Sequence, residues 1–150
     1  MNRILLTLST LIFILSFSTC ASTILINENL SPAEIIQRGQ EALERNRYRA
    51  AIQYYQALYD RNRLNIDLVI TAEYHIANIH YKQRKFTQSR EEFNKLLEYY
   101  NTPDEELLPQ HFKRLSQIVL QRIDEKERPL LRKKKKVEEQ VQVQEQVSED

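Results

Sequence analysis

Glycine, cysteine and tryptophan are nearly absent from this chain: its 150 residues include one Gly, one Cys and no Trp. A phosphate-cradling loop needs glycines at fixed spacing, so nucleotide-binding folds of the P-loop and dinucleotide types are excluded. A single cysteine cannot form an internal disulfide. The scarcity of Gly and Pro, together with many Leu, Ile, Gln, Glu, Arg and Lys residues, favours helix over sheet. The length allows one domain and little more.

An excess of charge of either sign is also missing, because 22 basic and 21 acidic residues leave a formal net charge of +1. This balance gives no reason to expect nucleic acid as a partner. Catalytic constellations are not visible either. His75 and His80 are five residues apart and fall on different faces of a helix, while His111 is remote, so convergent metal ligands are missing. We therefore predict no enzyme activity, no metal site and no cofactor.

The first 22 residues have the layout of a secretory signal peptide. Arg3 supplies a basic start, residues 4–17 form an apolar run, and small residues follow up to Ser22. The run of about 14 residues would span roughly 21 Å as a helix, which is short for a bilayer core of about 30 Å. A membrane span is the alternative. The run is followed by Cys20, whose place needs an explanation of its own.

Two stretches of the chain repeat each other 38 residues apart, in the order small, aromatic, small, aromatic, aliphatic. The equivalent pairs are Gly39 and Ala77, Tyr48 and Phe86, Ala51 and Ser89, Tyr55 and Phe93, and Leu58 and Leu96. A small residue on one helix lets the next helix approach, and large residues fill the space between units. We predict an all-α solenoid of two helix–turn–helix repeats plus a C-terminal helix, which must stack because a single unit cannot bury its apolar face.

Helix boundaries follow from caps and prolines. Ser31 to Glu34 form a capping box with Pro32 at the first helical position, and Thr102 to Glu105 repeat that pattern. The expected helices cover about 32–45, 48–61, 68–83, 87–100 and a fifth ending near 127, with Asn46 in a left-handed turn. Pro109 either kinks the fifth helix or begins it, and Pro129 ends it.

The chain is thereby divided into four parts. Residues 1–19 are the expected signal peptide, 20–30 a flexible tether, 31–128 the helical domain and 129–150 a charged disordered tail. The tail carries five basic residues at 132–136, followed by acidic residues among Gln and Val. An alternative is that the basic stretch contacts anionic lipid or a cell-wall polymer while the acidic end stays in solvent.

The repeat residues resemble tetratricopeptide repeats. Tyr81-Lys82-Gln83 with Phe86, Ser89 and Phe93 follows the consensus of that family, and Gly39, Tyr48, Ala51-Ile52 and Tyr55 form the first copy. Arg84 stands where the family usually has a turn glycine. Residues 31–101, with the lengthened repeat spacing and the N-terminal export signal, are similar to BamD-type lipoproteins of the β-barrel assembly machine. That family usually has about five repeats, against two here.

The resemblance implies a cellular location and binding partners. Phe17-Ser18-Thr19-Cys20 resembles a bacterial lipobox, so Cys20 would carry covalent acyl chains that hold the chain at the periplasmic side of the outer membrane. The alternative is ordinary cleavage after Ala21, which removes Cys20. Implied partners are a barrel-forming outer-membrane assembly protein and unfolded β-barrel substrates. Rival functions are a scaffold for cell-wall synthesis, secretion or pilus assembly, and a soluble periplasmic chaperone.

A peptide groove is the remaining candidate site. In tetratricopeptide pairs the first helix of each unit lines the concave side, which here selects Ile36, Gln40, Leu43, Tyr74, Asn78, Tyr81 and Lys82. Tyr74, Asn78 and Tyr81 stand at i, i+4 and i+7 and share one helix face. Two tyrosines flanking an amide would suit an extended segment of a partner. The alternative is that these tyrosines pack against the neighbouring helix.

Overall fold

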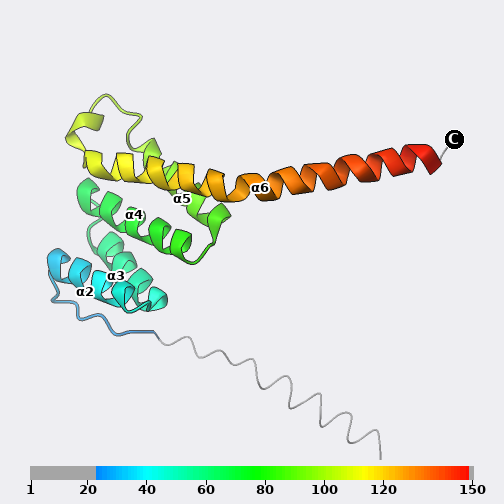
Figure 1. Ribbon diagram of the computed structural model, residues 1–150. Helices are drawn as coiled ribbons and strands as arrows, with labels where there is room; N and C mark the ends of the chain where they lie inside the picture. Colours follow the sequence, from blue (N-terminus) through cyan, green and yellow to red (C-terminus); the bar gives the residue numbers. More distant parts are fainter. Residues whose placement is uncertain (1–22, 149–150) are drawn as a thin grey trace, which may run out of the picture.

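The computed structural model describes residues 23–148, and Figure 1 shows their arrangement. Within that range the chain forms α-helices and one short 3₁₀ helix, and no strand. The elements are α2 (Pro32–Glu44), α3 (Tyr48–Arg61), α4 (Ile66–Lys82), α5 (Phe86–Glu98), η1 (Glu105–Leu107) and α6 (Gln110–Ser148). The all-α prediction is confirmed. Among the described helices none is long and apolar enough to cross a membrane.

Two helix–turn–helix units stack in chain order, as predicted. Helix α2 packs on α3 and α4 packs on α5, while α3 and α4 join the units. Both units turn through a left-handed residue, Asn46 with φ of 54° and Arg84 with φ of 61°. These two residues are 38 positions apart, so the repeat extends to backbone conformation. Glycine adopts this conformation without strain, whereas arginine does not.

The small residues of the repeat allow close helix packing. In the first unit, Gly39 lies against the ring of Tyr55: a Cβ atom added there would be 2.8 Å from the ring's Cζ. In the second unit the Ser89 hydroxyl donates a hydrogen bond of 2.9 Å to the Ala77 carbonyl. Ala51, Tyr55, Ala77, Ser89 and Phe93 are fully buried, Gly39 is buried, and Tyr48 and Phe86 are half-buried. These residues are therefore buried or half-buried where the helices of each unit meet.

Two apolar cores share helix α4. The first core holds Ile35, Tyr55 and Leu58 with Ala72 and Ile79 of α4. The second holds Ile70, Tyr74 and Ala77 of α4 with buried residues of α5 and α6, among them Phe93, Leu96, Phe112, Val119 and Ile123. Helix α4 is therefore apolar around most of its circumference, because it is buried on both sides.

Side-chain caps begin α2 and α4, whereas α3 and α5 have none. The Ser31 capping box is present, with the Glu34 side chain accepting from the Ser31 N–H at 2.8 Å. The second expected capping box is wrong: η1 has no side-chain cap, and the Thr102 hydroxyl donates to the Tyr99 carbonyl instead. Residues 105–107 form the short turn, and α6 begins directly after Pro109, so the second of the two alternatives for Pro109 holds.

Helix α6 covers one end of the stack and continues beyond it (Figure 1). Phe112, Ser116, Val119 and Ile123 face α4 and α5, and Arg90 of α5 forms ion pairs with Asp124 and Glu127. The prediction that Pro129 ends the helix was wrong, because α6 runs through Pro129 to Ser148. The prediction of a disordered tail was therefore also wrong for residues 129–148. Pro129 is exposed, and the Glu, Gln, Lys and Arg residues that follow favour helix.

The expected flexible tether differs from the observed conformation. Residues 23–30 lie along the first unit, where the Ile24 N–H donates to Gln53 Oε1 at 2.9 Å and the Arg61 guanidinium donates to the carbonyls of Ile26 and Asn27. Side chains of α3 thus hold the backbone of this segment. Cys20 and the expected signal peptide lie outside the described residues.

Candidate functional site

Helix α6 covers the second half of the predicted groove. Tyr74 is only 8% exposed, and its ring centroid lies 4.8 Å from that of Phe112 on α6 and 5.7 Å from that of Phe93. Tyr81 packs on Phe86, and the Lys126 ammonium of α6 lies 5.7 Å from the Tyr81 ring centroid. For these tyrosines the alternative holds: they pack against the neighbouring helices. The prediction that Tyr74 lines an open groove was wrong.

The other predicted groove residues do not gather at one open site. Ile36 and Leu43 are half-buried and pack against the first core. Asn78 is half-buried, and Gln40 and Lys82 are exposed. Sequence spacing placed these residues on the correct helices, but it could not show that α6 folds back over the second unit.

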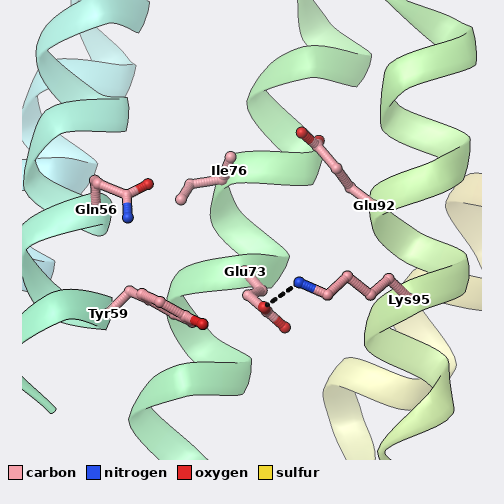
Figure 2. A pocket seen from close by; sticks show the side chains of 6 residues that line it. All are labelled: Gln56, Tyr59, Glu73, Ile76, Glu92 and Lys95. Carbon is pink, nitrogen blue, oxygen red and sulfur yellow. Dashed lines mark hydrogen bonds and ion pairs between the residues drawn. The ribbon is translucent and has the colours of Figure 1, made fainter. Parts of the chain in front are cut away.

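A groove opens instead between α3, α4 and α5, and Figure 2 shows side chains from all three helices around it. The hollow has a volume of about 270 Å³. Its lining residues are Gln56 and Tyr59 of α3, Glu73 and Ile76 of α4, and Glu92 and Lys95 of α5. On α4, Glu73 and Ile76 lie on a different face from Tyr74 and Tyr81, in accordance with helical periodicity.

Glu73 is the incompletely paired charge of this groove. Its side chain is 16% exposed, and its Oε1 atom accepts one long contact of 3.5 Å from Lys95 Nζ (Figure 2). Its Oε2 atom is buried and has no hydrogen-bond partner among the described residues. A buried acceptor without a donor is unfavourable, so this carboxylate is suited to a further donor.

Tyr99 stands beside the same carboxylate. Burial raises the pKa of Tyr99 to about 12, and the negative charge of Glu73, toward which the phenol is directed as a hydrogen-bond donor, adds to the shift. The phenol therefore stays protonated at neutral pH and remains a hydrogen-bond donor.

Glu92, by contrast, is already fixed. His80 Nδ1 lies 2.6 Å from Glu92 Oε2, and the Gln88 amide donates to Glu92 Oε1 at 3.1 Å. His80 is buried. Glu92 thus has a partner for each oxygen, and Glu73 is the acid with binding capacity left.

A second hollow of about 430 Å³ adjoins the first. It is lined by Ile66, Lys95, Glu98, Tyr99, Thr102 and Leu108, so Lys95 borders both hollows. From Ile66 to Ile76, α4 rises about 15 Å. Together the two hollows form one elongated depression along α4, which we call the α4 groove.

The α4 groove is equipped for non-covalent binding. Within residues 23–148 no group of three His, Cys, Asp or Glu side chains is arranged to hold a metal ion. Rings and aliphatic carbons of Tyr59, Ile76 and Leu108 provide apolar contact, while Glu73 and Tyr99 provide an acceptor and a donor. A peptide segment has both kinds of surface.

Sequence reasoning missed Glu73, Lys95 and Tyr99, although the repeat contained a pattern that identifies two of them. Thirty-eight residues before Glu73 stands Ile35, and before Lys95 stands Ala57. A charged residue thus replaces an apolar one at matched positions of the same repeat. Such a change indicates that the second unit exposes a surface that the first unit covers.

Comparison with known proteins gives little functional information. No family model matches this sequence, and no solved structure matches it. An uncharacterized protein of Treponema pallidum (strain Nichols) is 31% identical over 107 residues. The match covers 69% of this chain and 43% of that relative, so the chain corresponds to less than half of the relative's length.

Proposed function

We propose that this protein is a tetratricopeptide-like adaptor in the assembly of β-barrel outer-membrane proteins. It binds a segment of a partner protein in the α4 groove, with a barrel-forming assembly protein or an unfolded β-barrel substrate as that partner. Acyl chains on Cys20 anchor it to the outer membrane, and the helical domain faces the periplasm.

The observation that carries the binding role is the α4 groove itself. Three helices from two stacked units converge there, and a carboxylate oxygen of Glu73 has no hydrogen-bond partner in the part of the chain that the structure describes. Stacked helical repeats present extended surfaces of this kind for other proteins.

The choice of pathway is supported by sequence. The export layout of residues 1–22, the lone Cys20 and the similarity of residues 31–101 to BamD-type lipoproteins favour barrel assembly over the rival envelope functions. The left-handed turns at Asn46 and Arg84, and the small-to-large packing of Gly39 on Tyr55, support the helix–turn–helix repeat on which an adaptor of this kind would be built.

Co-purification tests the pathway. The tagged full chain is expressed in its own cells, membranes are solubilised gently, and bound proteins are identified by mass spectrometry. We expect the barrel-forming assembly protein in near-equal amount. Recovery of cell-wall enzymes or secretion subunits without that protein would contradict the barrel-assembly role and favour one of the rival scaffold functions.

Detergent partitioning tests the anchor. The wild-type chain should enter the detergent phase with a mass increase at Cys20, and Cys20→Ser should stay in the aqueous phase. Recovery of the wild-type chain in the aqueous phase, cleaved after Ala21, would favour the soluble chaperone.

A further inference from the structure

The repeat shows which part of the first unit corresponds to the α4 groove, and that part is occupied. Ile24 lines a hollow with Arg38 and Ala42 of α2 and Tyr54 of α3. In the 38-residue repeat, Arg38 is equivalent to Ile76, Ala42 to His80 and Tyr54 to Glu92. Ile76 and Glu92 line the α4 groove, and His80 contacts Glu92 at its border. The segment 23–30, which we call the N-terminal segment, therefore covers the first unit where the second unit is open.

The N-terminal segment binds as an extended chain. Ile24 and Ile26 are half-buried, whereas Leu25 and Asn27 are exposed, which is the alternation of an extended backbone. The segment starts beside the C-terminal half of α2 and ends at Ser31, the cap of that helix. It thus runs antiparallel to α2.

Side chains of α3 hold the backbone of this segment. Gln53 Oε1 accepts from the Ile24 N–H, and Arg61 donates to the carbonyls of Ile26 at 3.3 Å and Asn27 at 3.1 Å. In the second unit the residue equivalent to Arg61 is Tyr99. The phenol of Tyr99 is also a donor, and it faces the Glu73 carboxylate in the α4 groove.

The two units differ in the residue at one matched position of their first helices. Ile35, which is buried in the first unit, is replaced by Glu73 in the second. Glu73 Oε2 has no partner among the described residues, and the ammonium of Lys95, which contacts Oε1 at 3.5 Å, belongs to a side chain that is 67% exposed. An arriving cation would complete the pairing of this carboxylate, and Lys95 has room to move aside.

We propose that the α4 groove binds an extended segment of a partner protein, antiparallel to α4, whose central lysine or arginine pairs with Glu73. The rise of about 15 Å along the groove accommodates four to five extended residues at about 3.3 Å each. Apolar residues two positions away on either side of the cation contact Ile76 at one end and Leu108 at the other, and the Tyr59 ring lies beside Glu73 (Figure 2). This inference rests on the proposed adaptor role and specifies what the adaptor recognises.

Peptide selection tests the inference. A library of random heptapeptides displayed on phage is panned against the purified full chain in detergent, and in parallel against Glu73→Gln and Glu44→Gln. Glu44 is an exposed acid of α2 outside the groove, so its variant matches the change in charge. We expect wild type and Glu44→Gln to select Lys or Arg at one fixed position with apolar neighbours, and Glu73→Gln to lose that preference.

Affinity measurements complete the test. The selected peptide, labelled with fluorescein, should bind Glu73→Gln at least tenfold more weakly than wild type, and Glu44→Gln within twofold. Thermal unfolding by circular dichroism shows that each variant is folded. A basic preference that persists in Glu73→Gln, a selection without any Lys or Arg preference, or tighter binding of a synthetic peptide of residues 23–30 would overturn the inference.

The proposed pathway and the proposed Glu73 contact can be refuted independently of each other. If barrel-assembly proteins co-purify equally well with wild type and Glu73→Gln, the adaptor role stands and the Glu73 contact is wrong. If the basic peptides bind through Glu73 but other envelope proteins co-purify, the contact stands and the pathway is wrong.

Discussion

Gly39→Ala should destabilise the protein, although alanine is the better helix former. Gly39 lies in the interior of α2, where replacing Gly by Ala normally stabilises a helix by about 1 kcal/mol. Here the new Cβ atom would be 2.8 Å from Cζ of Tyr55, 3.0 Å from Cε2 and 3.1 Å from Cε1. The ring would have to move by about 0.6 Å to restore an ordinary contact of 3.4 Å.

That movement is blocked by the surrounding core. The Tyr55 ring is fully buried and stacks on the His75 ring, with centroids 4.4 Å apart and planes 8° apart. Overpacking a core costs about 1–3 kcal/mol. After subtraction of the helix gain of about 1 kcal/mol, we expect a net loss of about 1 kcal/mol in the free energy of unfolding.

A double-mutant cycle with Tyr55→Leu isolates the clash, because leucine removes the ring. Urea unfolding followed by circular dichroism gives the four free energies. In the Tyr55→Leu background Gly39→Ala should stabilise by about 1 kcal/mol, so the sign reverses and the coupling is about 2 kcal/mol. Stabilisation by Gly39→Ala in the wild-type background, or equal effects in both backgrounds, would refute the packing argument.

Further predictions concern the buried histidine, the buried hydroxyl and the strained turn. Burial lowers the pKa of His75 to about 4 from its ordinary 6.5, so the unfolded state takes up the proton first. The free energy of unfolding should therefore be highest above pH 6.5 and fall by about 3 kcal/mol between pH 6.5 and 4. Urea unfolding measured across this pH range should show a smaller fall for His75→Phe, and an equal fall in both proteins would contradict the assignment. Ser89→Ala removes the buried bond to the Ala77 carbonyl and should cost about 1 kcal/mol in urea unfolding; no loss would mean that the bond is not formed. Arg84→Gly relieves a left-handed arginine and should stabilise by about 1 kcal/mol, whereas Arg84→Val should destabilise, and a thermal melt that ranks them in the opposite order would contradict the turn geometry.

Local features of the fold were predictable because they depend on neighbouring residues. The capping box at Ser31 and the left-handed turn at Asn46 need only a few adjacent residues, and both are present. The 38-residue repeat also identified the buried partners Gly39 and Tyr55. The continuation of α6 through Pro129 was missed, since a proline removes one backbone hydrogen bond but need not end a helix when the residues that follow favour helix.

The candidate site was harder to predict because it depends on contacts distant in sequence. Tyr74 and Tyr81 were assigned to a groove, but Phe112 and Lys126 of α6 pack on them. Nothing in the spacing of the tyrosines shows where α6 lies. Glu73 could have been found by comparing it with Ile35, its repeat equivalent, and by asking why a buried position had acquired a charge.

Photo-crosslinking in living cells tests most directly the claim that the α4 groove holds a partner segment. A photoreactive phenylalanine analogue replaces Lys95 at the centre of the groove, and in a control chain it replaces Gln117, which is exposed on α6. We predict that irradiation joins the chain at position 95 to the barrel-forming assembly protein or to unfolded β-barrel substrates, and that position 117 gives little product. Equal crosslinking at both positions, or none at position 95 while the tagged chain still co-purifies its partner, would contradict the account.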